Sequence, residues 1–158
     1  MNNSLRRGLG FGLTSAVITT LGLIIGLYFS TNSKLVVIAG IIVIAIADGL
    51  SDSFGMHISV ESEARYKPKY IWQTALATFM AKFFIAIGFL IFVIPFSKNI
   101  ALILSIIYGL SLIAIFSFHI AKKGKIKPYK VVLEHLIMTV IVIFISFAIG
   151  RLLNCFIK

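Results

Sequence analysis

The chain has 158 residues, of which 59% are hydrophobic and 13% charged, and its mean hydropathy is +1.06. This composition excludes a water-soluble globular domain and indicates an integral membrane protein. The formal net charge of +10 would suggest nucleic-acid binding in a soluble protein, but the basic residues cluster in short connections between apolar segments, so no nucleic-acid partner is expected.

Five apolar segments of membrane-spanning length follow one another at about residues 9–29, 35–59, 70–94, 100–120 and 131–149. The first ends at the polar turn Ser30-Thr-Asn-Ser33, and Pro68 disfavours helical geometry just before the third. A basic loop that ends at Pro128 separates the fourth from the fifth. We therefore predict an all-α integral membrane protein, with a single transmembrane domain over residues 1–158.

Lysine and arginine are distributed unequally between the two ends of these segments. Ten lie on the side of the N-terminus: Arg6, Arg7, Arg65, Lys67, Lys69, Lys122, Lys123, Lys125, Lys127 and Lys130. Four lie on the other side: Lys34, Lys98, Arg151 and Lys158. Because basic residues favour the cytoplasmic side, we expect a cytoplasmic N-terminus and a C-terminus across the membrane.

Two aspartates one helical turn apart, Asp48 and Asp52, interrupt the second segment. A charged side chain near the bilayer centre costs at least about 2.5–3.5 kcal/mol, and such residues usually mark an ion or proton path. At a rise of about 1.5 Å per residue, Asp52 lies about 10 Å and Asp48 about 16 Å from the cytoplasmic end of the segment. Lys82, the only lysine within a segment, lies at about 18 Å on the next one. We therefore predict a Lys82–Asp48 ion pair and no basic partner for Asp52.

Polar and small residues recur at three- and four-residue steps along the second segment: Asp48, Ser51, Asp52, Gly55, Met56, Ser59 and Glu63. This spacing places them on one helical face, which we interpret as the wall of a pathway from the middle of the membrane to the cytoplasm. Carboxylate and hydroxyl oxygens suit hard divalent ions, whereas the thioether of Met56 favours softer ones. The mixture points to Fe²⁺ or Mn²⁺.

Two pairs of glycines in the first segment, Gly8 with Gly12 and Gly22 with Gly26, have the small-xxx-small spacing of closely packed membrane helices. We expect a homodimer that forms through this segment.

The first segment contains Gly10-Phe-Gly-Leu-Thr-Ser15, and the second ends in Gly55-x-x-x-Ser59-x-x-Ser-Glu63. Together with the five segments, these stretches resemble the vacuolar iron transporter family. The resemblance implies a homodimer that exports Fe²⁺, and often Mn²⁺, from the cytoplasm in exchange for protons, along a path between the protomers. The connection between the second and third segments lacks the family's metal-collecting insert. In this respect the chain resembles a small prokaryotic branch of the family, and the resemblance implies a location in the prokaryotic cell membrane.

The chain differs from this family at the positions that concern the ion. By resemblance, Ser15 stands where the family has an aspartate, Asp52 where it has a pathway methionine, and Met56 where it has a glutamate. The expected path begins near Glu63, continues to Asp52 with help from Met56, Ser51 and Ser15, and passes Asp48. The ion is the substrate, and no resident cofactor is expected.

Two alternatives use the same residues differently. In a non-transporting membrane scaffold, an Asp48, Asp52 and Lys82 cluster would serve assembly only. In an intramembrane enzyme, Asp48-Gly-x-x-Asp52 would begin the signature of the CDP-alcohol phosphotransferases, but the rest of that signature is absent. We therefore expect no enzymatic activity.

Overall fold

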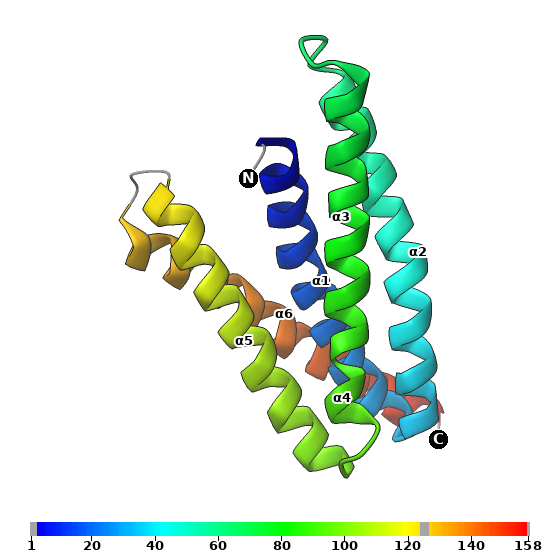
Figure 1. Ribbon diagram of the computed structural model, residues 1–158. Helices are drawn as coiled ribbons and strands as arrows, with labels where there is room; N and C mark the ends of the chain where they lie inside the picture. Colours follow the sequence, from blue (N-terminus) through cyan, green and yellow to red (C-terminus); the bar gives the residue numbers. More distant parts are fainter. Residues whose placement is uncertain (1–2, 124–126, 158) are drawn as a thin grey trace.

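A computed structural model describes residues 3–123 and 127–157, and within these ranges it contains helices and no strand (Figure 1). The helices are α1 (Asn3–Thr31), α2 (Lys34–Glu61), α3 (Pro68–Gly88), α4 (Leu90–Val93), α5 (Lys98–Lys123) and α6 (Pro128–Ile157). Among the described residues, five segments are long and apolar enough to cross a membrane, with α3 and α4 counted together. The prediction of an all-helical protein with five such segments is therefore confirmed.

The helices extend beyond the predicted segments. α1 begins at Asn3 rather than near residue 9, and α6 continues to Ile157 rather than ending near residue 149. Hydropathy marks only the part of a helix that matches the hydrocarbon core, whereas backbone hydrogen bonding continues through polar residues beyond it. The third segment is interrupted at Phe89, whose N–H donates to the carbonyl of Ala86 at 3.1 Å, three residues earlier, instead of four.

α1 is the central helix, and it packs against α2, α3, α5 and α6 (Figure 1). α2 and α3 lie side by side as a hairpin that continues beyond the start of α1, and α5 and α6 pack together on the other side. The connections are short. Ser33 caps α2 by accepting a hydrogen bond from the N–H of Val36 at 3.4 Å, and Pro68 occupies the first turn of α3, where its missing N–H costs nothing.

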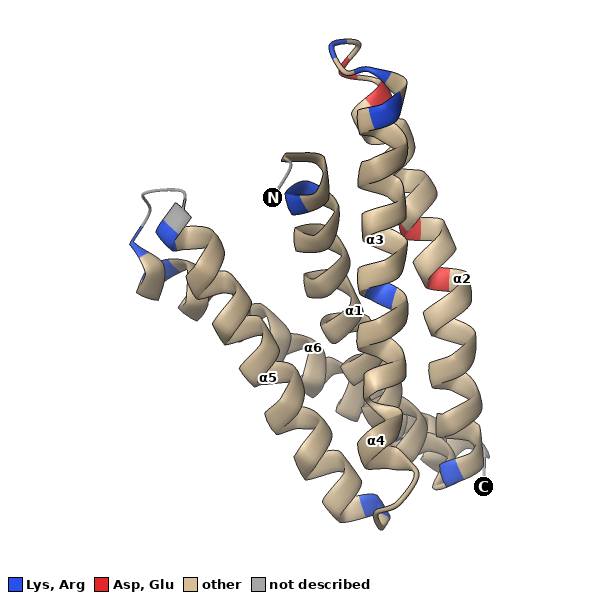
Figure 2. Ribbon diagram, viewed as in Figure 1, with Lys and Arg blue, Asp and Glu red and all other residues tan. Residues whose placement is uncertain are grey.

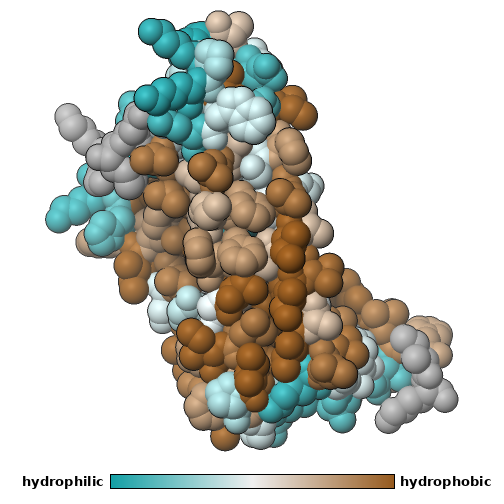
Figure 3. All heavy atoms as spheres, turned by 45° about the vertical axis from the view of Figure 1, so that its right-hand side comes forward, coloured by the Kyte–Doolittle hydropathy of each residue, from teal (hydrophilic) through white to brown (hydrophobic). Residues whose placement is uncertain are grey.

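The face of the molecule drawn in Figure 3 has a largely apolar middle and polar ends, which is the pattern of a multi-pass membrane protein. Large apolar side chains are exposed along α2 and α6, including Phe54 and Phe144. Basic residues gather where α1 starts, α2 connects to α3, and α5 approaches α6, which we name the basic end (Figure 2). Lys125 and Lys158, counted in the predicted charge asymmetry, lie outside the described residues.

The glycines of α1 pack against helices of their own chain. A Cβ at Gly12 would lie 2.6 Å from the carbonyl oxygen of Thr78 in α3, and one at Gly22 would lie 3.0 Å from Oγ of Ser146 in α6. Gly8 likewise faces α3, and Gly26 faces α6. The four glycines therefore mark places where α1 approaches α3 and α6 of its own chain, and a dimer interface through this segment stays a prediction.

Candidate functional site

Five polar side chains from three helices meet in the middle of the bundle, and we name them the midspan cluster: Ser15 and Thr19 of α1, Asp48 and Asp52 of α2, and Lys82 of α3. On α1 and on α2 the two residues are four positions apart, so they share a helical face. Gly49 allows the close approach of α3, because a Cβ there would lie 3.3 Å from the Phe79 ring and 3.9 Å from Cβ of Lys82.

Lys82 is the centre of the cluster, and its side chain is only 2% exposed. Its ammonium group contacts Oδ2 of Asp48, Oδ2 of Asp52 at 2.5 Å and Oγ of Ser15 at 3.0 Å. An ammonium has three N–H donors and no acceptor, so every donor of Lys82 has a partner. The predicted Lys82–Asp48 pair is confirmed. The expectation that Asp52 lacks a basic partner is wrong, because aspartates one turn apart lie within reach of a single lysine.

Hydroxyl groups of α1 complete the contacts of the two bonded carboxylate oxygens. Ser15 Oγ donates to Oδ2 of Asp52 at 2.7 Å, and Thr19 Oγ1 lies 3.1 Å from Oδ2 of Asp48 and 3.0 Å from the carbonyl of Ser15. Ser15 was predicted as a site residue. Thr19 was not, although its position one turn after Ser15, on the same face of α1, identifies it.

The cluster carries more negative than positive charge. With every group ionised, two carboxylates and one ammonium leave a surplus of one negative charge. Within the described part of the chain, Oδ1 of Asp48 and Oδ1 of Asp52 accept no hydrogen bond, and the two side chains are 28% and 23% exposed. The ammonium is thus enclosed, whereas the second carboxylate oxygens are available for a proton or a cation.

The other residues of the polar face lie towards the basic end. Ser51, Gly55 and Ser59 are exposed, and Met56 is partly buried. Nothing lies within 4 Å of a Cβ built at Gly55, so the face of α2 that carries Gly55 is open, whereas α3 packs against another face of the same stretch. Within the described ranges no group of three or more His, Cys, Asp or Glu side chains is arranged to hold a metal ion. One chain therefore offers a cation two carboxylates, supplemented by neutral oxygens or Met56.

Glu63, predicted as the first ligand on the path, is held elsewhere. Its carboxylate contacts Nη1 of Arg7 at 2.5 Å and Nη2 of Arg65 at 2.7 Å, and we name these residues the terminal cluster. The hydrogen bond from Arg7, supported by that from Arg65, lowers the pKa of Glu63 below its usual value. Glu63 is thus not an unpaired ligand, because the turn after α2 places it between two guanidinium groups.

The three histidines lie outside the midspan cluster. His57 packs edge-on against Trp72, with ring centroids 4.5 Å apart. His135 of α6 is hydrogen-bonded to Ser117 of α5 at 2.7 Å, and His119 contacts the carbonyl of Ile115.

No family model, curated protein or solved structure matches the chain. The resemblance to the vacuolar iron transporters therefore stays a prediction.

Proposed function

We propose that this protein is a multi-pass membrane transporter that exports Fe²⁺ or Mn²⁺ from the cytoplasm, with the midspan cluster as its cation site. The observation that carries the proposal is the surplus negative charge in the middle of an apolar helix bundle, on carboxylates whose Oδ1 oxygens accept no hydrogen bond from the described residues. Ionisable groups at such a position are expensive, and they are found chiefly in ion and proton pathways.

The charges of the cluster suggest how ion and proton movements are coupled. A divalent ion at the Oδ1 oxygens weakens the attraction that holds the Lys82 ammonium against Oδ2. If the proton of Lys82 then leaves to the cytoplasmic side, from which the ion entered, two carboxylates and one divalent ion form a neutral group, which the apolar surroundings favour. A proton that returns to Lys82 from the opposite side restores the ammonium and displaces the ion. This exchange is the proton antiport that the sequence resemblance implies.

The route to the cluster follows the open face of α2. The basic end faces the cytoplasm in this proposal, because basic residues favour that side. From there the ion passes Ser59, Gly55 and Met56 to reach Asp52, whereas Glu63 stays paired with Arg7 and Arg65. A second copy of the chain against this face would shield its polar groups from lipid, which supports the predicted homodimer with α2 rather than the glycines of α1 at the interface.

A second candidate is a non-transporting membrane scaffold. The full set of partners around Lys82 favours it, since a completely satisfied ion cluster can hold three helices together without moving any ion.

Proteoliposomes loaded with a Mn²⁺-sensitive dye test both candidates. Asp52→Asn keeps the side-chain size and leaves a balanced Lys82–Asp48 pair, so the bundle is expected to fold. Loss of one charged ligand lowers affinity by at least about tenfold, and Mn²⁺ uptake should fall accordingly. Glu134→Gln is the matched control, because it makes the same carboxylate-to-amide change on an exposed residue of α6 and should leave uptake unchanged.

Equal Mn²⁺ and Fe²⁺ uptake by the wild type and Asp52→Asn would contradict the proposed role of the cluster. A wild type that moves neither ion under a proton gradient of either direction, while Asp52→Asn lowers its melting temperature, would favour the scaffold.

A further inference from the structure

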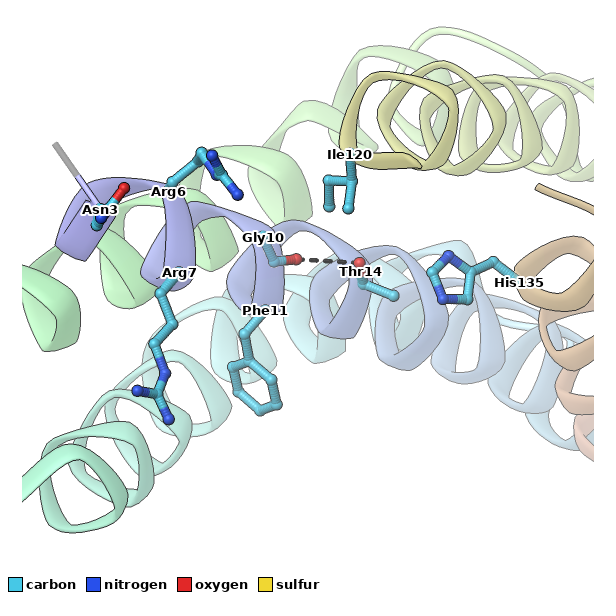
Figure 4. Close-up of a pocket in the computed structure, with 8 residues that line it drawn as sticks. All are labelled: Asn3, Arg6, Arg7, Gly10, Phe11, Thr14, Ile120 and His135. Atoms are coloured by element: carbon cyan, nitrogen blue, oxygen red, sulfur yellow. Dashed lines mark hydrogen bonds between the residues drawn. The ribbon is translucent and has the colours of Figure 1, made fainter. Parts of the chain in front are cut away.

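A groove opens at the basic end, beside the first turns of α1 and outside the midspan cluster. It has a volume of about 610 Å³ and lies between the first turns of α1, the end of α5 and the start of α6. Figure 4 shows Gly10, Phe11 and Thr14 of α1 along it, with Ile120 reaching in from α5 and His135 from α6.

The mouth of the groove is positively charged. Arg6 is exposed and makes no ion pair or hydrogen bond with any residue in the described ranges, whereas the neighbouring Arg7 is engaged by Glu63. Lys122, two residues beyond Ile120, and Lys130 are exposed at the same end of α5 and α6. No described acidic side chain lines the groove. An anionic group is therefore the ligand that its mouth would attract.

The walls of the groove are apolar. Phe11 and Ile120 lie in membrane-spanning helices and are 44% and 39% exposed, so an apolar ligand can contact both side chains. The hydroxyl of Thr14 donates to the carbonyl of Gly10 at 3.0 Å, and His135 is bonded to Ser117, so the polar side chains farther along the groove already have partners. Arg6 and Thr14 are separated by a rise of about 12 Å, which spans a lipid headgroup and the first part of its acyl chains.

We propose that this groove binds an anionic phospholipid, with the phosphate at Arg6 and an acyl chain along Phe11 and Ile120. A basic mouth next to an apolar wall, at the end of a transmembrane bundle, fits the two chemical halves of such a lipid. The proposal does not depend on ion transport, because neither the groove nor Arg6 belongs to the midspan cluster.

Binding can be measured on the full-length protein in detergent, by native mass spectrometry during titration with phosphatidylglycerol. Phosphatidylcholine and inorganic phosphate serve as the comparison ligands. Arg6→Gln should weaken phosphatidylglycerol binding by about fivefold or more. Gly10→Leu fills the groove without changing charge, since a Cβ at Gly10 points at Ile120 and Phe116 from 3.8 Å, and it should weaken binding similarly. Arg151→Gln, at the opposite end of α6, is the matched control and should bind as the wild type does.

We expect Arg6→Gln and Gly10→Leu each to bind phosphatidylglycerol more weakly while both stay monodisperse and helical. Arg151→Gln should bind it as the wild type does. Equal losses in Arg6→Gln and Arg151→Gln, with Gly10→Leu unchanged, would overturn the proposal in favour of diffuse surface charge. Equal binding of phosphatidylcholine, or competition by inorganic phosphate at the same concentration as the lipid, would also overturn it.

Discussion

The midspan and terminal clusters both hold carboxylates against basic side chains, but in opposite ratios. The midspan cluster has two carboxylates and one ammonium, whereas the terminal cluster has one carboxylate and two guanidinium groups. The surplus charge of the terminal cluster lies on guanidinium groups at the helix ends, where Arg65 is 69% exposed, whereas that of the midspan cluster lies on carboxylates within an apolar, membrane-spanning segment. In the midspan cluster the surplus needs hydroxyl groups, a proton or a cation. The midspan cluster is therefore the one that we propose as the ion site.

The largest expected effect concerns the midspan cluster. Lys82→Met removes the one cation that both aspartates share and should lower the free energy of unfolding by about 3 kcal/mol, because it leaves two half-buried carboxylates with hydroxyl groups but no basic partner. Thermal unfolding in detergent at neutral pH measures this loss.

The triple variant Lys82→Met, Asp48→Asn, Asp52→Asn separates charge from packing, since it has the same methionine and no carboxylate. It should regain most of the lost stability. A single Lys82→Met variant as stable as the wild type would show that the two clusters do not differ as described.

A smaller effect is expected where α1 and α3 approach each other beside the midspan cluster. Gly12→Ala should lower the free energy of unfolding by about 1–3 kcal/mol, because its Cβ would meet the Thr78 carbonyl at 2.6 Å and force α3 outwards. Gly55→Ala is the control on α2. It has open space around it and should be neutral or stabilising by up to about 1 kcal/mol. Equal melting temperatures for the two variants would refute this packing.

The smallest effect is expected in the terminal cluster. Its charges are screened by water and salt, so Glu63→Gln should lower the melting temperature less than Lys82→Met does, and added salt should reduce the difference further. The lowered pKa of Glu63 sets the pH dependence. Its stabilisation is fully present above the ordinary pKa of 4.5 and is lost as the pH falls through the lowered value.

Melting curves of the wild type and Glu63→Gln at pH values from 7 to about 3 measure this dependence, and they should converge at the acidic end. A difference that grows with acidity would reverse the sign argued here.

Structural features that depend on local sequence patterns were predicted better than contacts between distant segments. Apolar segment length predicted five membrane-spanning helices, and depth along antiparallel neighbours predicted the contact of Lys82 with Asp48. The contact of Lys82 with Asp52 was missed, because the prediction paired residues by their depth in the membrane and did not consider how far a lysine side chain extends.

The terminal cluster and the glycine contacts depend on how distant segments fold together. Glu63, which contacts Arg7, lies in the turn where Ala64 adopts a φ of 54°. A positive φ is uncommon for a residue other than glycine, so the sequence does not predict this turn. Small-residue spacing indicates a closely packed helix, but it does not say which helix lies against it. The glycines of α1 therefore predicted close packing, but their spacing did not identify α3 and α6 as the helices that pack against them.

The three partners of the Lys82 ammonium also bear on electrical leakage across the membrane. A proton or an inorganic ion that crosses the bundle must break one of these contacts first, and an unpaired charged donor in apolar surroundings costs several kcal/mol. With all three donors paired, the Lys82 ammonium should therefore oppose the passage of other cations through the midspan cluster. Only a cation that binds the two carboxylates more strongly than the Lys82 ammonium does should displace it. Proteoliposomes that contain the protein without such a cation should therefore keep an imposed membrane potential.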